Sequence, residues 1–182
     1  IGQMMEPVEF KEQKFPPLPP KDWATTGCKG RKPNVINSLY LDPIEEEKLN
    51  FKLAAKYEEM KKNEVRFEEF NTETDYRVLL VAYGTTARVC KTAIRQLKEK
   101  GIDTALLRPI TLFPFPVERV FELSQRADFV MSIEMSTGQM VEDVQLAVGR
   151  TKPVFFYGRT GGMVPSPEEV VAAVEKHLGG KA

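Results

Sequence analysis

Histidine and cysteine are scarce in this chain, which limits the sites that need an imidazole or a thiolate. The 182 residues include one histidine, His177, and two cysteines, Cys28 and Cys90. One imidazole and two thiols make a poor zinc site, and an iron–sulfur cluster normally needs four thiolates. The two cysteines could form one disulfide, but a single pair without a secretory signal is better interpreted as two reduced thiols. The sequence predicts no metal site.

Net charge, long apolar runs and targeting segments are also missing. The 26 basic residues balance the 26 acidic ones, which leaves no electrostatic argument for binding nucleic acid or an anionic membrane. No apolar run reaches the about 18 residues that a membrane span requires. The start, Ile1 to Pro7, has no basic region of a signal peptide, and a chain that begins with Ile suggests a piece of a longer protein. We expect a cytoplasmic protein without nucleic-acid or membrane partners.

Nucleotide and nucleophile motifs are absent as well. No Gly-x-Gly-x-x-Gly follows a strand, and Gly84 to Thr92 departs from the P-loop because Cys90 stands where that pattern needs glycine. Without Gly-x-Ser-x-Gly there is no serine elbow to form a triad with His177. His177 lies near the end of the last predicted helix, where the helix dipole favours a cation, so a surface or capping role is expected. No catalytic residue is predicted.

Residues 1–42 are predicted to be an irregular, proline-rich arm. The segment Phe15–Pro20 (FPPLPP) indicates a polyproline II spacer, which we favour over an SH3 ligand despite its PxxP spacing. Further on, residues 25–32 (TTGCKGRK) join two glycines to three basic residues. This basic loop could be simply solvated, or it could bind a phosphorylated ligand or a neighbouring subunit.

A long amphipathic helix is predicted over residues 43–71. Asp42 is a good N-cap, Pro43 suits the first helical position, and Glu45 places acid in the first turn. Residues at intervals of three or four, Leu49, Leu53, Tyr57, Met60, Glu64 and Phe67, mark one narrow, mainly apolar stripe that runs from about Ile44 to Phe70 on an otherwise charged helix. Such a helix must pack its stripe against another surface.

From residue 72 to residue 182, strand-like and helix-like stretches alternate. The strand-like runs are Tyr76–Tyr83, Asp103–Arg108, Asp128–Glu134 and Pro153–Tyr157, and the expected helices cover 86–100, 116–126, 140–149 and 166–177. Ser136–Gln139 and Ser166–Glu169 both have the spacing of a capping box before a helix. Apolar strands separated by helices predict an α/β fold, a three-layer αβα domain around a mostly parallel sheet.

Two loops of this domain form the candidate site. In an open doubly wound sheet, ligands bind beyond the carboxyl ends of strands where the strand order reverses, often between the first and third strands. The loops that follow those strands could hold an anion such as a CoA or nucleotide phosphate, through Gly84, Thr85, Thr86 and Arg88 and through Glu134, Ser136, Thr137 and Gly138. The alternative is that Gly84 makes a turn, a threonine caps the helix, and an arginine or backbone donors hold Glu134.

A third loop, residues 158–162 (GRTGG), follows the fourth predicted strand. Its glycines could wrap a phosphate, but a flexible connection is the favoured interpretation.

Six strings together point to a family. They are IGQMMEPVE at residues 1–9, TGCKGR at 26–31, NVINSL at 34–39, YGTTAR at 83–88, RPITLFPFP at 108–116 and EMSTGQM at 134–140. Over essentially its whole length, the chain resembles the C-terminal part of the alpha subunit of 2-oxoacid:ferredoxin oxidoreductases, closest to the 2-ketoisovalerate (3-methyl-2-oxobutanoate) branch. The most specific of the strings is RPITLFPFP.

The resemblance implies a complex that oxidatively decarboxylates a 2-oxoacid on thiamine diphosphate, passes electrons through iron–sulfur clusters to ferredoxin and makes an acyl-CoA. It also implies the fold of the transketolase C-terminal domain, whose parallel sheet usually includes one antiparallel strand, although the repeat pattern reveals no such strand. The family's catalytic glutamate lies upstream of Ile1. The diphosphate and Mg²⁺ motif belongs to the thiamine-binding beta subunit, and another subunit carries the iron–sulfur clusters.

We therefore expect a fragment of an alpha subunit that holds no cofactor of its own and is inactive alone. Its role would be assembly of an oligomeric complex and shaping of the approach to the active site. The alternatives are an anion or CoA-phosphate module at residues 84–88 and 134–138, or an independent protein-interaction domain.

Overall fold

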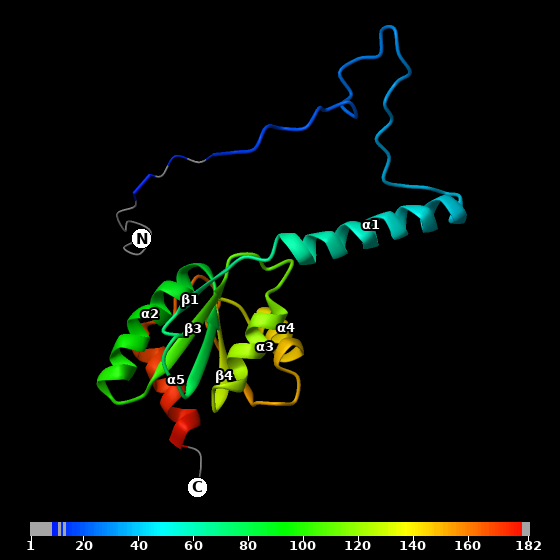
Figure 1. Ribbon diagram of the computed structural model, residues 1–182. Helices are drawn as coiled ribbons and strands as arrows, with labels where there is room; N and C mark the ends of the chain where they lie inside the picture. Colours follow the sequence, from blue (N-terminus) through cyan, green and yellow to red (C-terminus); the bar gives the residue numbers. More distant parts are fainter. Residues whose placement is uncertain (1–8, 11, 13, 180–182) are drawn as a thin grey trace. The chain divides into compact units, whose positions relative to one another are not determined.

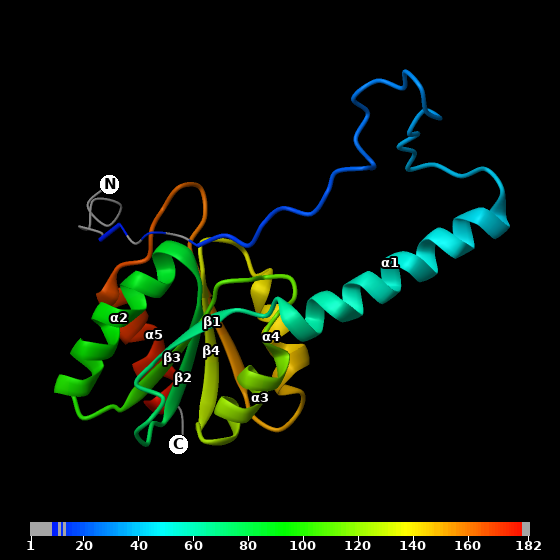
Figure 2. The same ribbon diagram turned by 45° about the horizontal axis from the view of Figure 1, so that its top comes forward.

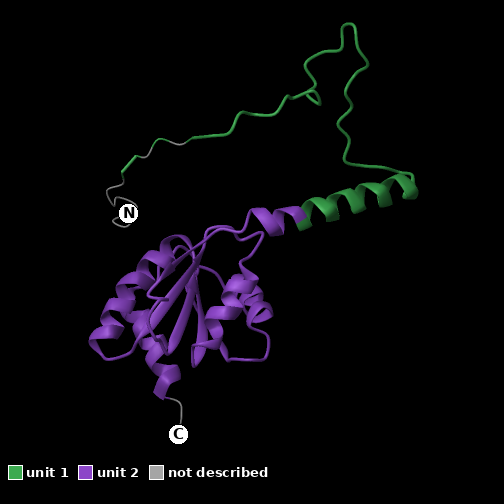
Figure 3. Cartoon of the chain, viewed as in Figure 1, with its two compact units in different colours: residues 1–58 green, residues 59–182 purple. Residues whose placement is uncertain are grey.

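The computed structural model describes residues 9, 10, 12 and 14–179. The chain forms two compact units, Ile1–Glu58 and Glu59–Ala182, which are coloured separately in Figure 3. The second unit contains the sheet and its covering helices. None of the helices in the described residues is both long enough and apolar enough to cross a bilayer.

Helix α1 (Pro43–Asn63) begins where the sequence predicts. Asp42 Oδ1 accepts the backbone N–H groups of Ile44 at 2.8 Å and Glu45 at 3.4 Å, as an N-cap should. The helix then ends at Asn63, so the predicted continuation to residue 71 is wrong.

Strand β1 (Phe67–Phe70) occupies the end of the segment predicted to be helical. It pairs antiparallel with β3 (Thr104–Pro109), with Phe67 opposite Pro109 and Phe70 opposite Leu106. The two phenylalanines are three residues apart and fit the local helical pattern, whereas the pairing with β3 is a long-range contact that such a pattern does not contain. β1 is the antiparallel strand that the family resemblance implied and the repeat pattern did not reveal.

One five-stranded sheet carries the second unit, in the order β1-β3-β2-β4-β5 (Figures 1 and 2). The remaining strands are β2 (Val78–Ala82), β4 (Phe129–Glu134) and β5 (Val154–Gly158), and β2, β3, β4 and β5 are parallel to one another. The predicted α/β class with a mostly parallel sheet is confirmed.

Helices cover both faces of this sheet. α2 (Gly84–Glu99) and α5 (Pro167–Gly179) pack on one face, and α3 (Val117–Gln125) and α4 (Met140–Val148) pack on the other. Side chains along β2 alternate between the two cores: Leu80 faces α2 and α5, whereas Leu79 and Val81 face α3 and α4. Because β2, β4 and β5 are parallel, their carboxyl ends lie at the same end of the sheet, and the loops that follow them lie next to one another.

Candidate functional site

The order of the strands reverses at β2, which lies between β3 and β4. Ala82 at the end of β2 is in register with Ile133 near the end of β4. The two predicted loops, residues 84–88 and 134–138, therefore leave the sheet next to each other at the topological switch point. This is the arrangement that the sequence predicted, and the chemistry of the site depends on which of its polar groups already have partners.

Glu134 is completely buried at this point, and its carboxylate caps helix α4. It accepts five hydrogen bonds, from Ser132 Oγ (2.9 Å), Ser136 Oγ (2.8 Å) and the backbone N–H groups of Gln139 (3.1 Å), Met140 (3.0 Å) and Val141 (2.8 Å). These backbone groups are the donors that a helix N-terminus would otherwise offer to an external anion. The chain's own carboxylate occupies this half of the predicted anion site.

The capping box predicted at Ser136–Gln139 does not form. The Ser136 hydroxyl donates to Glu134 and accepts the backbone N–H of Gly138 at 3.1 Å, and no side chain of the N-cap residue Gln139 caps the helix. The spacing is correct for the motif, but the carboxylate of Glu134, at the end of β4, accepts the backbone N–H groups that a capping box would use. Thr137 is exposed in the loop, and Gly138 has a left-handed φ of 107°.

The charge of Glu134 is fixed by these contacts. Burial acts to raise its pKa, but the hydrogen bonds from the N–H of Gln139, from both serine hydroxyls and from Met140 outweigh burial, so its pKa lies below the usual value. Nearby, burial together with the charges of Glu142 and Glu134 raises the pKa of Asp143. The start of α4 is therefore an acidic environment, which disfavours a phosphate there.

The other half of the switch point is the start of α2. Gly84 is exposed and has a φ of 55°, a left-handed conformation that favours glycine, so the predicted turn is present. Thr86 is buried, and its hydroxyl donates to the carbonyl oxygen of Tyr83 at 2.6 Å instead of accepting an N–H, so the predicted threonine cap is wrong. The N-cap residue Tyr83 makes no side-chain capping bond. Thr85 is half-buried and Arg88 is exposed on the first turns of α2.

The loop after β5 is tied to the same region. The backbone N–H of Arg159 donates to the carbonyl oxygen of Glu134 at 3.2 Å, and its guanidinium pairs with Glu169. The predicted capping box of α5 is present: Ser166 N–H donates to Glu169 Oε2 at 2.9 Å, and Glu169 N–H donates to Ser166 Oγ at 3.2 Å. Because its arginine is engaged within the domain, this loop is better described as a structural connection than as a phosphate cradle.

The three potentially reactive side chains are not arranged for catalysis. His177 stacks on Phe155 with ring centroids 3.8 Å apart, and burial raises the pKa of the Cys90 thiol. Cys28 and Cys90 are both free, the first exposed and the second buried. Among the residues that the structure describes, no three potential metal ligands of the His, Cys, Asp and Glu types come together.

The basic loop at residues 25–32 has an organisation that the sequence did not reveal. The Arg31 guanidinium donates to the carbonyl oxygens of Ala24, Gly27 and Lys32, at 3.4, 2.5 and 2.8 Å. Asn34 Nδ2 donates to the carbonyl oxygens of Asp22 at 2.6 Å and Ala24 at 3.0 Å, just before the loop. The arginine therefore stabilises the shape of the loop, and its lysines remain exposed.

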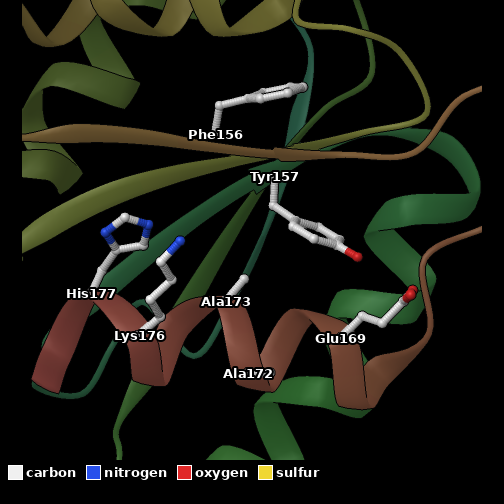
Figure 4. A pocket seen from close by; sticks show the side chains of 7 residues that line it. All are labelled: Phe156, Tyr157, Glu169, Ala172, Ala173, Lys176 and His177. Carbon is white, nitrogen blue, oxygen red and sulfur yellow. The ribbon is translucent and has the colours of Figure 1, made fainter.

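Sequence reasoning missed a groove between β5 and α5, with a volume of about 330 Å³. Figure 4 shows Tyr157 pointing toward α5 and Phe156 pointing to the opposite side of the strand. The groove is lined by Phe156, Tyr157, Glu169, Ala172, Ala173, Lys176 and His177. The available signal was indirect: the last strand of a doubly wound sheet often lies at its edge, where one side is open.

Comparison with known proteins places these features in context. Residues 77–170 match the family of the pyruvate:ferredoxin oxidoreductase core domain II. The chain is 40% identical over 179 residues to the ketoisovalerate oxidoreductase subunit VorB of Methanothermobacter marburgensis, covering 98% of this chain and 50% of that protein. It is 37% identical over 144 residues to the 2-oxoglutarate synthase subunit KorA of Archaeoglobus fulgidus, covering 78% and 39%. The chain spans about half the length of the VorB relatives it matches.

Two solved structures share the fold. The 2-oxoglutarate:ferredoxin oxidoreductase of Magnetococcus marinus, with 2-oxoglutarate, coenzyme A and succinyl-CoA bound, has a TM-score of 0.65 at 20% identity, covering 78% of this chain and 24% of that chain. An inactive beta4 tetramer of a split-gene transketolase has a TM-score of 0.52 at 22% identity, covering 60% and 40%. The predicted transketolase-type fold is confirmed.

Proposed function

This chain belongs to the pyruvate:ferredoxin oxidoreductase core domain II family and is part of the alpha subunit of a 2-oxoacid:ferredoxin oxidoreductase. We propose that it serves the assembly of such an enzyme. The proposed substrate of the complete complex is 3-methyl-2-oxobutanoate. The observation that carries this assignment is the similarity to VorB, which extends over 98% of the chain, whereas the similarity to the KorA of Archaeoglobus fulgidus covers 78%.

Assembly, and not chemistry, is the role that the side chains of this region support. The polar groups at the switch point are used internally: Glu134 caps α4, and Arg159 pairs with Glu169. In contrast, α1 has no buried residue, and the side chains of Ile44 and Phe51 are 63% and 68% exposed. Apolar side chains on a charged helix are stabilised when another surface covers them. We propose that this surface belongs to the remainder of the complex.

The cofactors of such a complex would be held elsewhere. Of the two helix starts at the switch point, that of α4 already holds the Glu134 carboxylate, so it does not fit the diphosphate of thiamine diphosphate. We propose that the thiamine-binding beta subunit holds this cofactor with Mg²⁺, that another subunit carries the iron–sulfur clusters, and that ferredoxin and CoA are substrates of the whole complex. This chain would then shape the approach to a site formed by others.

Reconstitution tests both parts of the proposal. The chain is mixed with the remainder of the alpha subunit, supplied as a separate polypeptide, and with the other subunits, and reduction of a viologen dye is followed with each 2-oxoacid. We expect no reduction by the chain alone and restored reduction in the mixture, faster with 3-methyl-2-oxobutanoate than with 2-oxoglutarate. Activity of the chain alone would refute the assembly role, and a preference for 2-oxoglutarate would refute the substrate assignment.

A second candidate function is an anion module at the start of α2. It is favoured by the missing side-chain cap at Tyr83, which leaves this helix start different from that of α4. Of the residues predicted for it, Gly84, Thr85 and Arg88 lie on the first turns of α2, whereas the Thr86 hydroxyl donates to the carbonyl oxygen of Tyr83. Calorimetric titration with CoA, thiamine diphosphate and inorganic phosphate distinguishes the two functions. The assembly role predicts no binding heat, whereas heat that is lost in Arg88→Ala would support the anion module.

A further inference from the structure

Strand β5 forms an edge of the sheet, because β4 is its only neighbour. On β4, Val130 donates its backbone N–H to the carbonyl oxygen of Pro153 at 2.9 Å. Alternate residues of a parallel strand bond to the same neighbour, so the backbone groups of Val154, Phe156 and Gly158 point away from β4. Within the part of the chain that the structure describes, no segment pairs with these outer groups. The outer edge of β5 therefore offers a row of unused donors and acceptors.

This edge also lacks the features that normally prevent a further strand from pairing. The five residues of β5, VFFYG, include neither a charge nor a proline. Figure 4 shows the side chain of Tyr157 pointing toward α5 and that of Phe156 pointing to the other side of the sheet. A strand that pairs with β5 has the same alternation, so every second side chain of that strand would enter the groove beside α5.

The middle of this groove is apolar and open enough for a side chain of moderate size. Ala172 and Ala173 form its wall on α5, and their methyl side chains keep that wall low. The ring of Tyr157 lies on the strand side of the groove. An apolar side chain that enters between these two walls is removed from water.

The two ends of the groove differ in charge. Glu169 lies at one end, where its carboxylate pairs with Arg159 and accepts the backbone N–H of Ser166 at 2.9 Å. Lys176 lies at the other end beside His177; it is exposed, and no ion-pair partner for it lies among the described residues. The groove thus has a free ammonium group and no free carboxylate. A second copy of this chain would not complement it, whereas an acidic side chain of a different polypeptide would.

The spacing along α5 matches the spacing along a strand. Helix α5 lies alongside β5, and His177 near its end stacks on Phe155 near the start of the strand (Figure 4). Ala172 and Lys176 are four residues apart, which is about 6 Å along a helix. Side chains two residues apart on one face of a strand are separated by about 6.6 Å. An apolar residue and an acidic residue with one residue between them therefore fit Ala172 and Lys176 together.

We propose that β5 and α5 bind an extended segment of another polypeptide, which joins the sheet as a sixth strand. An apolar side chain of this segment packs against Ala172, and a carboxylate two residues away pairs with Lys176. The hydrogen bonds to the strand edge supply affinity, and the two side chains supply selectivity, as in other cases where a peptide adds a strand to a sheet. This inference does not depend on the proposed function, because its test involves neither the other subunits nor enzyme activity.

The first test is a titration of the full chain against a fluorescently labelled peptide, Thr-Val-Thr-Val-Thr-Glu-Thr with both ends blocked, followed by fluorescence anisotropy. We expect saturable binding. Two further peptides are N-methylated on one or the other alternate set of amides. Only one set faces β5, so methylation of that set should abolish binding and methylation of the other should not. No binding at about 1 mM chain, or equal effects of the two methylation patterns, refutes the proposal.

A charge exchange tests the contact with Lys176. Lys176→Glu should weaken binding of the glutamate peptide about 5-fold and strengthen binding of a peptide with lysine in place of glutamate. Lys98→Glu, which changes an exposed lysine on α2, is the matched control and should leave both affinities unchanged. If the wild-type chain binds the two peptides equally well, the proposed pairing is wrong.

Filling the groove tests its occupant. Ala172→Phe places a ring where the apolar side chain of the segment would lie, and it should abolish peptide binding, whereas Ala54→Phe, on an exposed residue of α1, should not. Both substitutions are on exposed helix positions, so the chain should remain folded by circular dichroism. Sedimentation of the same variants is the final control. A dimer of the wild type that Ala172→Phe dissociates would show that a second copy covers the groove and would overturn the inference.

Discussion

Replacing Glu134 with glutamine is the most informative change in this domain. The carboxylate is fully buried and accepts five hydrogen bonds, three of them from the first backbone N–H groups of α4. Glutamine keeps one acceptor oxygen but turns two N–H donors toward groups that are themselves donors. Hydrogen bonds to a charged group contribute about 1.5–3 kcal/mol each, but they are not additive and glutamine retains some, so we expect Glu134→Gln to cost about 2–4 kcal/mol.

The measurement is urea unfolding of the full chain, followed by far-UV circular dichroism. Circular dichroism is chosen because the single tryptophan, Trp23, belongs to the first unit, whereas the sheet belongs to the second. Glu142→Gln is the matched control: it removes a carboxylate from the same helical turn, on an exposed side chain, and should cost about 0.5 kcal/mol.

The effect should depend on pH with a definite sign. The pKa of Glu134 is lowered in the folded state, so its contribution to the free energy of unfolding is complete above the unfolded value of about 4.3 and is lost as the pH falls through the folded pKa. The difference between the wild type and Glu134→Gln should therefore be large at neutral pH and shrink in acid. If Glu134→Gln costs no more than Glu142→Gln, or if the difference is independent of pH, the carboxylate does not hold this loop.

Three further predictions follow from individual contacts. Ellman's reagent should modify one thiol of the native chain, Cys28, and two after denaturation, because Cys90 is buried and burial raises its pKa; rapid modification of both in the native state would contradict the fold. Arg119 donates two hydrogen bonds, at 2.6 and 2.9 Å, to the carboxylate of Glu69 and so joins α3 to β1. Arg119→Met should therefore lower the free energy of unfolding in urea by about 1 kcal/mol and raise the lowered pKa of Glu69. An unchanged Glu69 pKa in an NMR titration would contradict this. Gly158→Ala should lower the melting temperature, because its Cβ would lie 2.4 Å from a phenylalanine ring and 2.5 Å from a carbonyl oxygen; an unchanged melting temperature would show that this close approach is absent.

The helices and parallel strands of the second unit were predictable because their signals are local. Val89, Ala93, Ile94 and Leu97 of α2 have the spacing of one face of a helix, and all four are buried. The N-cap at Asp42 and the capping box at Ser166–Glu169 also form as predicted, since both motifs join groups within three residues of one another.

Two errors in the prediction arise because a residue pairs with a group on another element. Phe67 and Phe70 fit the helical stripe, but pairing with β3 converts them into a strand, and only the fold brings β3 to them. The Ser136–Gln139 motif had the right spacing for a capping box, but Glu134 at the end of β4 reaches the same donors. A local motif forms only when no group from another element makes stronger hydrogen bonds or contacts with the same residues.

By itself, the amino-acid sequence determined the αβα class, the position of the two switch-point loops and the family, because apolar periodicity, turn residues and motif strings are properties of contiguous residues. Only the tertiary structure decided that the chain's own carboxylate occupies the start of α4, that β1 joins the sheet as an antiparallel edge strand, and that a groove lies between β5 and α5. Those features depend on strand order and on which buried donors meet which acceptor. Both are settled when segments distant in the sequence pack together and bury their polar groups against one another.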